Sequence, residues 1–186
     1  MLGAVAVLVS GCGGQPDPFV GTPDPCAMVP EQTIDEVVGE QVRVVTGTVE
    51  GRCSWWYNVG SAAPVGNNVV VERDLTLTLN SVDASPLGSG TEIADRSLPD
   101  SLDTGGERVE PLDGVGDEAY ISTGGLFELK AGADLRVGNM LAEIQYTGRN
   151  TNQFGTVQDL SAEQVRKTVI RVAQEVAREL RARADR

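Results

Sequence analysis

Three cysteines and a complete lack of histidine limit the chemistry open to this chain of 186 residues. Without an imidazole there is no Ser-His-Asp or Cys-His catalysis, no histidine-bound zinc, and no unperturbed side chain that titrates between about pH 5 and 8. The odd number of cysteines indicates one pair and one thiol with a separate task. The composition therefore favours a binding role over the common catalytic mechanisms.

The thiol with the separate task is expected to be Cys12. An apolar run at 2–9 leads into the sequence V-S-G-C at 9–12, which resembles the lipobox of bacterial lipoproteins, where the cysteine sulfur carries a diacylglycerol. The run is too short for a transmembrane helix, which needs about 20 apolar residues, but it suits the core of a signal peptide. The alternative, an apolar N-terminal strand with an incidental cysteine, is disfavoured by the polar, proline-rich sequence that follows.

No basic region precedes this apolar core, because the first Lys or Arg in the sequence is Arg43. We expect a start codon further upstream, with 1–11 as the rest of a signal peptide and 12–25 as a lipidated cysteine and its Pro/Gly-rich tether. Residues 26–186 would form one domain at the outer face of the cell membrane. At ~3.3–3.6 Å per residue the tether could reach up to roughly 45 Å.

Cys26 and Cys53 are predicted to form a structural disulfide, because disulfides persist outside the cytoplasm. Between them, 30–39 is typical of a short helix, with proline near its start and glycine after its end. The bridge would tie this helix to an aromatic-rich strand beginning at Cys53, and would contribute about 3.5 kcal/mol in a chain-entropy estimate. A catalytic dithiol would want Cys-x-x-Cys spacing, and a metal site would need further ligands.

Trp55 and Trp56 are the candidate binding residues. As neighbours on a strand, their rings should point to opposite faces of a sheet. One can pack in the core near the disulfide. The other must lie under a helix, under a loop or in a ligand groove.

The acidic residues are weaker candidates. Asp117 and Glu118 are neighbours and should diverge, whereas retaining glycosidases need carboxyl groups about 5 Å apart and facing each other. They are better interpreted as a turn leading into a strand. Asp100, Asp103 and Glu107 surround a Gly-Gly pair, but their spacing matches no known calcium loop. We predict no catalytic residue, no metal site and no cofactor.

The elements that must position these residues are strands followed by a helix. The stretch 68–81 contains three valines and then leucine alternating with threonine at 75–79, which predicts a half-buried strand. The stretch 84–107 is rich in Ser, Gly, Asp and Pro, hints at a brief helix only at 93–95, and has the least expected order. Further apolar stretches predict antiparallel strands at 118–122, 126–130 and 133–146, the last broken near Gly138-Asn139, with tight turns at Gly124-Gly125 and Ala131-Gly132.

A capping box of Ser161 and Gln164 predicts a long helix over 162–183. Its apolar stripe should pack on the sheet, and consists of Val165, Val169, Val172, Ala173, Val176 and Leu180. Its opposite face carries Lys167, Arg171 and Arg178.

Charge is segregated along the chain. Seven bases and four acids give 161–186 a net +3, so the remainder of a chain with net charge -12 carries -15. This acidic body argues against a nucleic-acid partner. The basic helix face could meet anionic lipid headgroups or wall polymers. The simpler interpretation is a solvated face with Glu163–Lys167 and Glu179–Arg183 pairs.

Several segments together resemble a large family of actinobacterial lipoproteins of unknown function. They are Asp-Pro-Cys at 24–26, Cys-Ser-Trp at 53–55, the stretch 114–120 and the C-terminal helix. The family continues its Asp-Pro-Cys with x-Leu-Leu, where this chain has Ala-Met-Val, which keeps the apolar character. The resemblance covers 24–183 and implies a secreted α+β domain with one disulfide. It carries no known catalytic residues.

The expected fold is α+β: a curved antiparallel sheet packed against a long C-terminal amphipathic helix, with a short N-terminal helix tied to the sheet by the disulfide. The expected function is non-catalytic binding of a small apolar or cell-wall ligand, or of an envelope protein, by a domain anchored through Cys12. The alternatives are an envelope hydrolase with paired carboxylates and a structural spacer.

Overall fold

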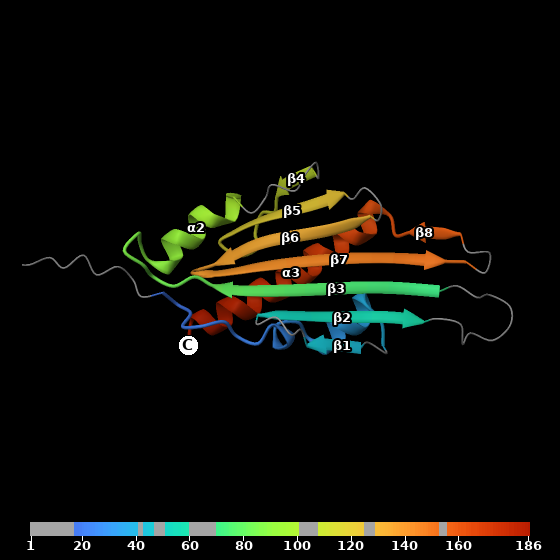
Figure 1. Cartoon of the computed structure of the whole chain (residues 1–186), viewed down its shortest axis with the longest axis horizontal. Helices are drawn as coiled ribbons and strands as arrows, with labels where there is room; N and C mark the ends of the chain where they lie inside the picture. The colour runs from blue at the N-terminus through green and yellow to red at the C-terminus, as the bar shows by residue number, and fades with distance from the viewer. Residues whose placement is uncertain are drawn as a thin grey trace, which may run out of the picture.

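The computed structural model describes residues 17–40, 43–46, 51–59, 70–100, 108–124, 129–152 and 156–186. In these ranges one antiparallel sheet of eight strands has the order β1-β2-β3-β7-β6-β5-β4, with β8 paired to β7. The long helix α3 lies behind the sheet (Figure 1). The predicted α+β class is confirmed.

The strands are β1 (Arg43–Thr46), β2 (Arg52–Val59), β3 (Val70–Ser81), β4 (Arg108–Pro111), β5 (Glu118–Gly124), β6 (Lys130–Val137), β7 (Met140–Thr151) and β8 (Val157–Asp159). The helices are the 3-10 turn η1 (Pro25–Ala27), α1 (Glu31–Val37), α2 (Gly90–Asp100) and α3 (Ala162–Ala184).

The core lies between α3 and one face of the sheet. Side chains alternate along each strand, and the three leucines of β3, Leu75, Leu77 and Leu79, are fully buried as predicted. The apolar stripe of α3 packs against this face and is also fully buried. The capping box of Ser161 and Gln164 starts α3 at Ala162, as expected.

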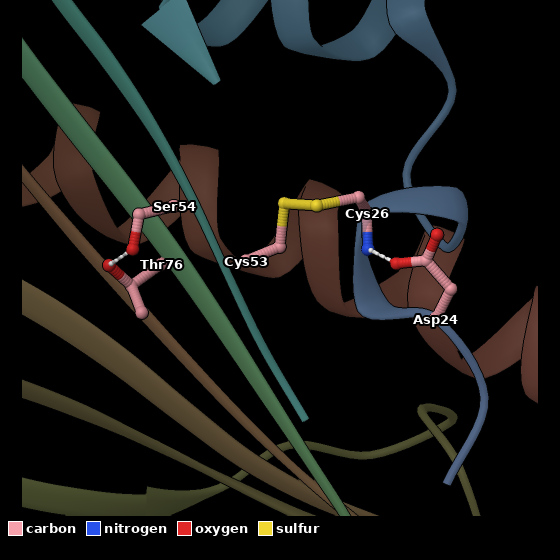
Figure 2. Close-up of a disulfide and its surroundings, with 5 residues drawn as sticks. All are labelled: Asp24, Cys26, Cys53, Ser54 and Thr76. Atoms are coloured by element: carbon pink, nitrogen blue, oxygen red, sulfur yellow. Dashed lines mark hydrogen bonds between the residues drawn. A yellow bond between two sulfur atoms is a disulfide. The ribbon is translucent and has the colours of Figure 1, made fainter. Parts of the chain in front are cut away.

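The disulfide between Cys26 and Cys53 is present, and it joins η1 to β2 (Figure 2). Asp24 Oδ1 accepts a hydrogen bond of 2.9 Å from the Cys26 backbone N–H and so caps η1. The following helix, α1, begins one residue later than the sequence suggests, because Pro30 is its N-cap rather than its first residue. The short N-terminal helix is thereby tied to the sheet.

Helix α2 corrects the expectation of little order over 84–107 for the described part of that range, since 101–107 lies outside the described residues. It runs for 11 residues where the sequence hints at three. Its first N–H groups, those of Gly90 and Thr91, donate to the carboxylate of Asp17 at 2.8 and 2.9 Å. Ala94 and Leu98 are buried on its inner side. The local sequence does not reveal this helix, because the carboxylate that accepts from its first N–H groups lies 73 residues earlier in the chain.

The hairpins differ from the sequence prediction at one turn. The predicted turn at Ala131-Gly132 is wrong, since both residues lie inside β6. Gly132 allows close packing there, because a Cβ atom on it would lie 3.0 Å from Ser122 Oγ. The predicted break at Gly138-Asn139 is the β6–β7 turn, with Gly138 at φ +58°. Most of the predicted stretch 126–130 lies outside the described residues.

The segment 17–24 has no regular structure, as the tether prediction requires, but it lies on the domain rather than free of it. Phe19 is 8% exposed and belongs to the core cluster. Thr22 Oγ1 accepts a hydrogen bond of 3.2 Å from the Ser81 N–H. Residues 17–24 are therefore part of the folded domain, because their side chains find partners on it. Cys12 lies outside the described residues.

Candidate binding site on the open face of the sheet

The two neighbouring tryptophans lie on opposite faces of the sheet, as the sequence predicts. Trp55 is 3% exposed and packs in the core, in register with Leu75. Trp56 is 37% exposed on the face away from α3, in register with Asp74. The open face around Trp56 is therefore the candidate binding surface.

Strands β2, β3 and β7 form the surroundings of Trp56. Residues directly opposite one another in an antiparallel sheet share a face. The register produces three rows across these strands: Trp56–Asp74–Thr147, Asn58–Glu72–Arg149 and Ser54–Thr76–Gln145. Polar groups of all three strands thus lie beside one aromatic ring.

Hydrogen bonds hold these polar side chains in place. Glu72 accepts from Asn58 Nδ2 at 3.1 Å through one carboxylate oxygen and pairs with the Arg149 guanidinium through the other. Ser54 Oγ and Thr76 Oγ1 lie 3.0 Å apart and share a hydrogen bond (Figure 2). The site is therefore ordered by the protein itself.

A shallow hollow of about 250 Å³ lies over Trp56, lined by Trp56, Glu72, Arg73, Asp74, Thr147 and Arg149. Arg73 donates to the backbone carbonyls of Glu72 and Arg149 at 2.7 and 2.9 Å, which fixes its guanidinium. The lining thus has one aromatic wall, two cations and two carboxylates. It carries no excess of either charge.

A smaller hollow of about 70 Å³ continues along the same face, lined by Arg52, Thr76, Thr78, Glu143 and Gln145. Gln145 Nε2 donates to Glu143 Oε1 at 2.6 Å. The two hollows share the face of β3 and β7 and together form a polar strip. The sequence singled out only Trp56 from this strip, since the other side chains are brought to it by strand pairing.

Asp117 and Glu118 do not form an acid–base pair. Asp117 Oδ2 accepts from the Gly138 N–H at 2.7 Å. Glu118 Oε1 instead accepts from the Tyr120 hydroxyl at 2.8 Å, and this hydrogen bond raises the pKa of Tyr120. The interpretation as a turn leading into β5 is confirmed.

The basic face of α3 makes ion pairs with the acidic body. Arg171 pairs with Glu36 of α1. Hydrogen bonds from Gln32 and Arg171 lower the pKa of Glu36. On α3 itself the predicted Glu179–Arg183 pair forms at 2.9 Å. These contacts favour the simpler interpretation of this face over a binding surface for anionic polymers.

In the described ranges, no group of three or more Cys, Asp or Glu side chains could hold a metal ion. Asp103 and Glu107 lie outside the described ranges, so the structure does not test a calcium site formed by Asp100, Asp103 and Glu107. None of the described helices is long and apolar enough to cross a membrane.

No protein-family model matches the chain, and no curated protein or solved structure matches it either. The site is therefore interpreted from its own geometry.

Proposed function

We propose that this protein is a lipid-anchored, extracytoplasmic binding domain that holds a neutral, polyhydroxylated ligand, a sugar unit of the cell wall, over Trp56. The observation that carries this proposal is the 37% exposed indole of Trp56 forming one wall of a hollow whose other walls are polar. Binding occurs without catalysis.

The chemistry of the lining fits a sugar ring. An indole face buries the C–H face of a ring, while charged groups make strong, directional hydrogen bonds to hydroxyls. Glu72, Asp74 and Arg149 supply such groups beside Trp56. Because Glu72 and Arg149 already hold each other, little side-chain ordering remains to oppose binding.

The charge balance and the volume of the hollow over Trp56 further restrict the class of ligand that it can hold. The balance of arginines and carboxylates in the lining favours a neutral ligand over an anion. The volume of about 250 Å³ lies below the ~300–1,000 Å³ of pockets for drug-sized molecules. The four charged side chains of the lining disfavour the small apolar ligand among the sequence-based expectations.

The carboxylate arrangement argues against the hydrolase alternative. Glu72 and Asp74 are two residues apart on one strand, so their side chains leave the sheet side by side, roughly 6.6 Å apart along the strand. A glycosidase pair instead faces across the scissile bond. In addition, one carboxylate oxygen of Glu72 accepts a hydrogen bond from Asn58, and the other pairs with Arg149.

The extracytoplasmic location is supported by two features. The sequence at 9–12 matches a lipobox and would place a diacylglycerol on Cys12. The Cys26–Cys53 disulfide suits an oxidising compartment. We also propose membership of the actinobacterial lipoprotein family, on the cysteine and tryptophan motifs quoted above.

Isothermal titration with neutral sugars tests the ligand class. The probes are N-acetylglucosamine, galactose, arabinose and mannose, each as a monosaccharide and as a disaccharide. We expect at least one to bind and to perturb Trp56 fluorescence, and Trp56→Ala to abolish binding. Val157→Ala, at an exposed site on β8, should bind like the wild type.

Three results would contradict the proposal. They are the absence of binding by every sugar, undiminished binding by Trp56→Ala, and cleavage of a bound disaccharide, which would favour the hydrolase. Crosslinking in the native membrane that joins residue 56 to an envelope protein instead of to glycan would favour the protein-partner alternative.

A further inference from the structure

We infer that the end of the sheet where residues 17–20 dock is a membrane-contacting surface, with Val20 and Leu87 entering the interface of the lipid bilayer. The inference rests on the proposed lipidation of Cys12, and adds to it an orientation for the domain. The partner is the bilayer surface itself.

The first argument is the length of chain between lipid and domain. Cys12 and Asp17 are five residues apart, so their Cα atoms can lie at most roughly 18 Å from each other. Asp17 is held at the start of α2 by bonds from Gly90 and Thr91. The lipid therefore keeps this end of the sheet near the bilayer.

The second argument is the position of the exposed apolar side chains. Among the described residues, Val20 and Leu87 are the two most exposed large hydrophobic side chains, at 101% and 80%. Val20 lies between Phe19, which is bonded to Asn139, and Thr22, which is bonded to Ser81 at the end of β3. Leu87 lies in the connection from β3 to α2, so both belong to this end of the sheet (Figure 1). Val157, also exposed, lies at the opposite end, where β8 pairs with the last residues of β7.

Local structure presents both side chains outward. Val20 follows Phe19, whose backbone is fixed by two hydrogen bonds with Asn139. Leu87 lies within a tight turn closed by Ser85 and Gly88, which exchange backbone hydrogen bonds of 2.9 and 3.0 Å. Each apolar tip therefore projects from a defined position.

The contact is apolar rather than electrostatic. The same end carries charges of both signs: Arg96 donates to the Leu87 carbonyl, Arg136 pairs with Asp95, and Arg181 lies 3.9 Å from Asp117. Mixed charge gives no strong attraction to anionic headgroups. Apolar tips gain by burial at the boundary of headgroups and acyl chains in any bilayer.

This orientation directs the candidate binding site away from the membrane. Asp74 is seven residues before Ser81 on β3, a distance of roughly 23 Å along the strand. Because Ser81 is at the membrane end, the hollow over Trp56 lies in the distal half of the sheet. The domain would then present it towards the cell wall.

Spin-label accessibility on lipidated full-length protein tests the contact. With Cys12 lipidated and Cys26 bonded to Cys53, Leu87→Cys supplies a free thiol for a nitroxide, and Val157→Cys is the matched control. In vesicles of phosphatidylcholine, with or without phosphatidylglycerol, we expect the label at 87 to lose collisions with an aqueous nickel chelate severalfold and to gain collisions with oxygen. The label at 157 should collide with the nickel chelate and with oxygen at the same rates with vesicles as without them.

The outcomes separate the inference from the anchor. A lipidated protein whose labels at 87 and 157 are equally accessible to nickel would overturn the inference and leave the anchor standing. An intact mass that reports an unmodified Cys12 would overturn both. With Asp17→Asn, folded by circular dichroism, we expect part of the protection at 87 to be lost, since the N-terminal segment is then less firmly fixed.

Discussion

Asn139 and Phe19, which are 120 residues apart in the chain, hold each other through two hydrogen bonds. The Phe19 N–H donates to Asn139 Oδ1 at 3.0 Å, and Asn139 Nδ2 donates to the Phe19 carbonyl at 2.9 Å. The same amide also donates to the Val82 carbonyl at 3.0 Å. One buried side chain thus joins the N-terminal segment, the end of β3 and the β6–β7 turn.

Asn139→Ala should lower the free energy of unfolding by about 1–3 kcal/mol, because buried backbone groups of Phe19 lose their partner. Urea denaturation followed by circular dichroism measures this. Asn80→Ala, at an exposed position of β3, is the control and should change stability by less than about 0.5 kcal/mol. Equal effects of the two variants would show that the Asn139 bonds are not stabilising.

The tryptophans should respond oppositely to truncation. Trp55→Ala removes a core side chain that is 3% exposed, and we expect a loss of about 3–5 kcal/mol in unfolding free energy. Trp56→Ala should leave stability nearly unchanged and remove the solvent-exposed component of the fluorescence. Denaturation curves compare the two variants. A larger loss of unfolding free energy for Trp56→Ala than for Trp55→Ala would contradict the burial of Trp55.

Reduction of the disulfide should destabilise the domain. The bridge spans a sequence separation of 27, for which chain-entropy reasoning gives about 3.5 kcal/mol. The midpoint of urea denaturation should fall when dithiothreitol is added to the wild type. The double variant Cys26→Ser/Cys53→Ser should have the lower midpoint of the reduced wild type, and dithiothreitol should not change it. A wild-type midpoint insensitive to dithiothreitol would be inconsistent with a stabilising role.

Stability should depend on pH through Asp17. Hydrogen bonds from the backbone N–H groups of Thr91 and Gly90 lower the pKa of this carboxyl from 3.8. A carboxyl whose pKa is lower in the folded state stabilises the fold above its unfolded pKa, and that contribution is lost as pH falls through the folded value.

Thermal denaturation of the wild type and Asp17→Asn at a series of pH values measures this linkage. The wild type should be the more stable near neutral pH, and the difference should shrink as the solution is acidified below about pH 3.8. A difference that stays constant into acid would mean that ionised Asp17 does not stabilise α2.

Local patterns were sufficient to predict much of this fold. The alternation of Leu75, Leu77 and Leu79 and the opposed rings of Trp55 and Trp56 follow from the two-residue repeat of a strand. The start of α3 is encoded by its own capping box. In each case the residues that determine the structure are near neighbours in the sequence.

Predictions failed where the determining partner is distant. Helix α2 depends on Asp17 for its N-terminal hydrogen bonds, which no local pattern reveals. Ala131-Gly132 is a reasonable turn sequence, but both residues pair with β5 on one side and β7 on the other, which no local pattern reveals. The candidate site depends on the same kind of information, because Asp74 and Thr147 meet beside Trp56 only through the pairing of β3 with β7.

The bonds between Phe19 and Asn139 can form only after both residues, 120 positions apart, are available for folding. In the secretion that we propose, the chain would cross the membrane from its N-terminus, and Phe19 would emerge long before Asn139. In the export that we propose, the N-terminal segment would not form these bonds until Asn139 has crossed the membrane, and the enzymes that modify Cys12 would meet this segment while it is still accessible. Anchoring would thus come first, and closure of the domain over its own first residues would come late in export.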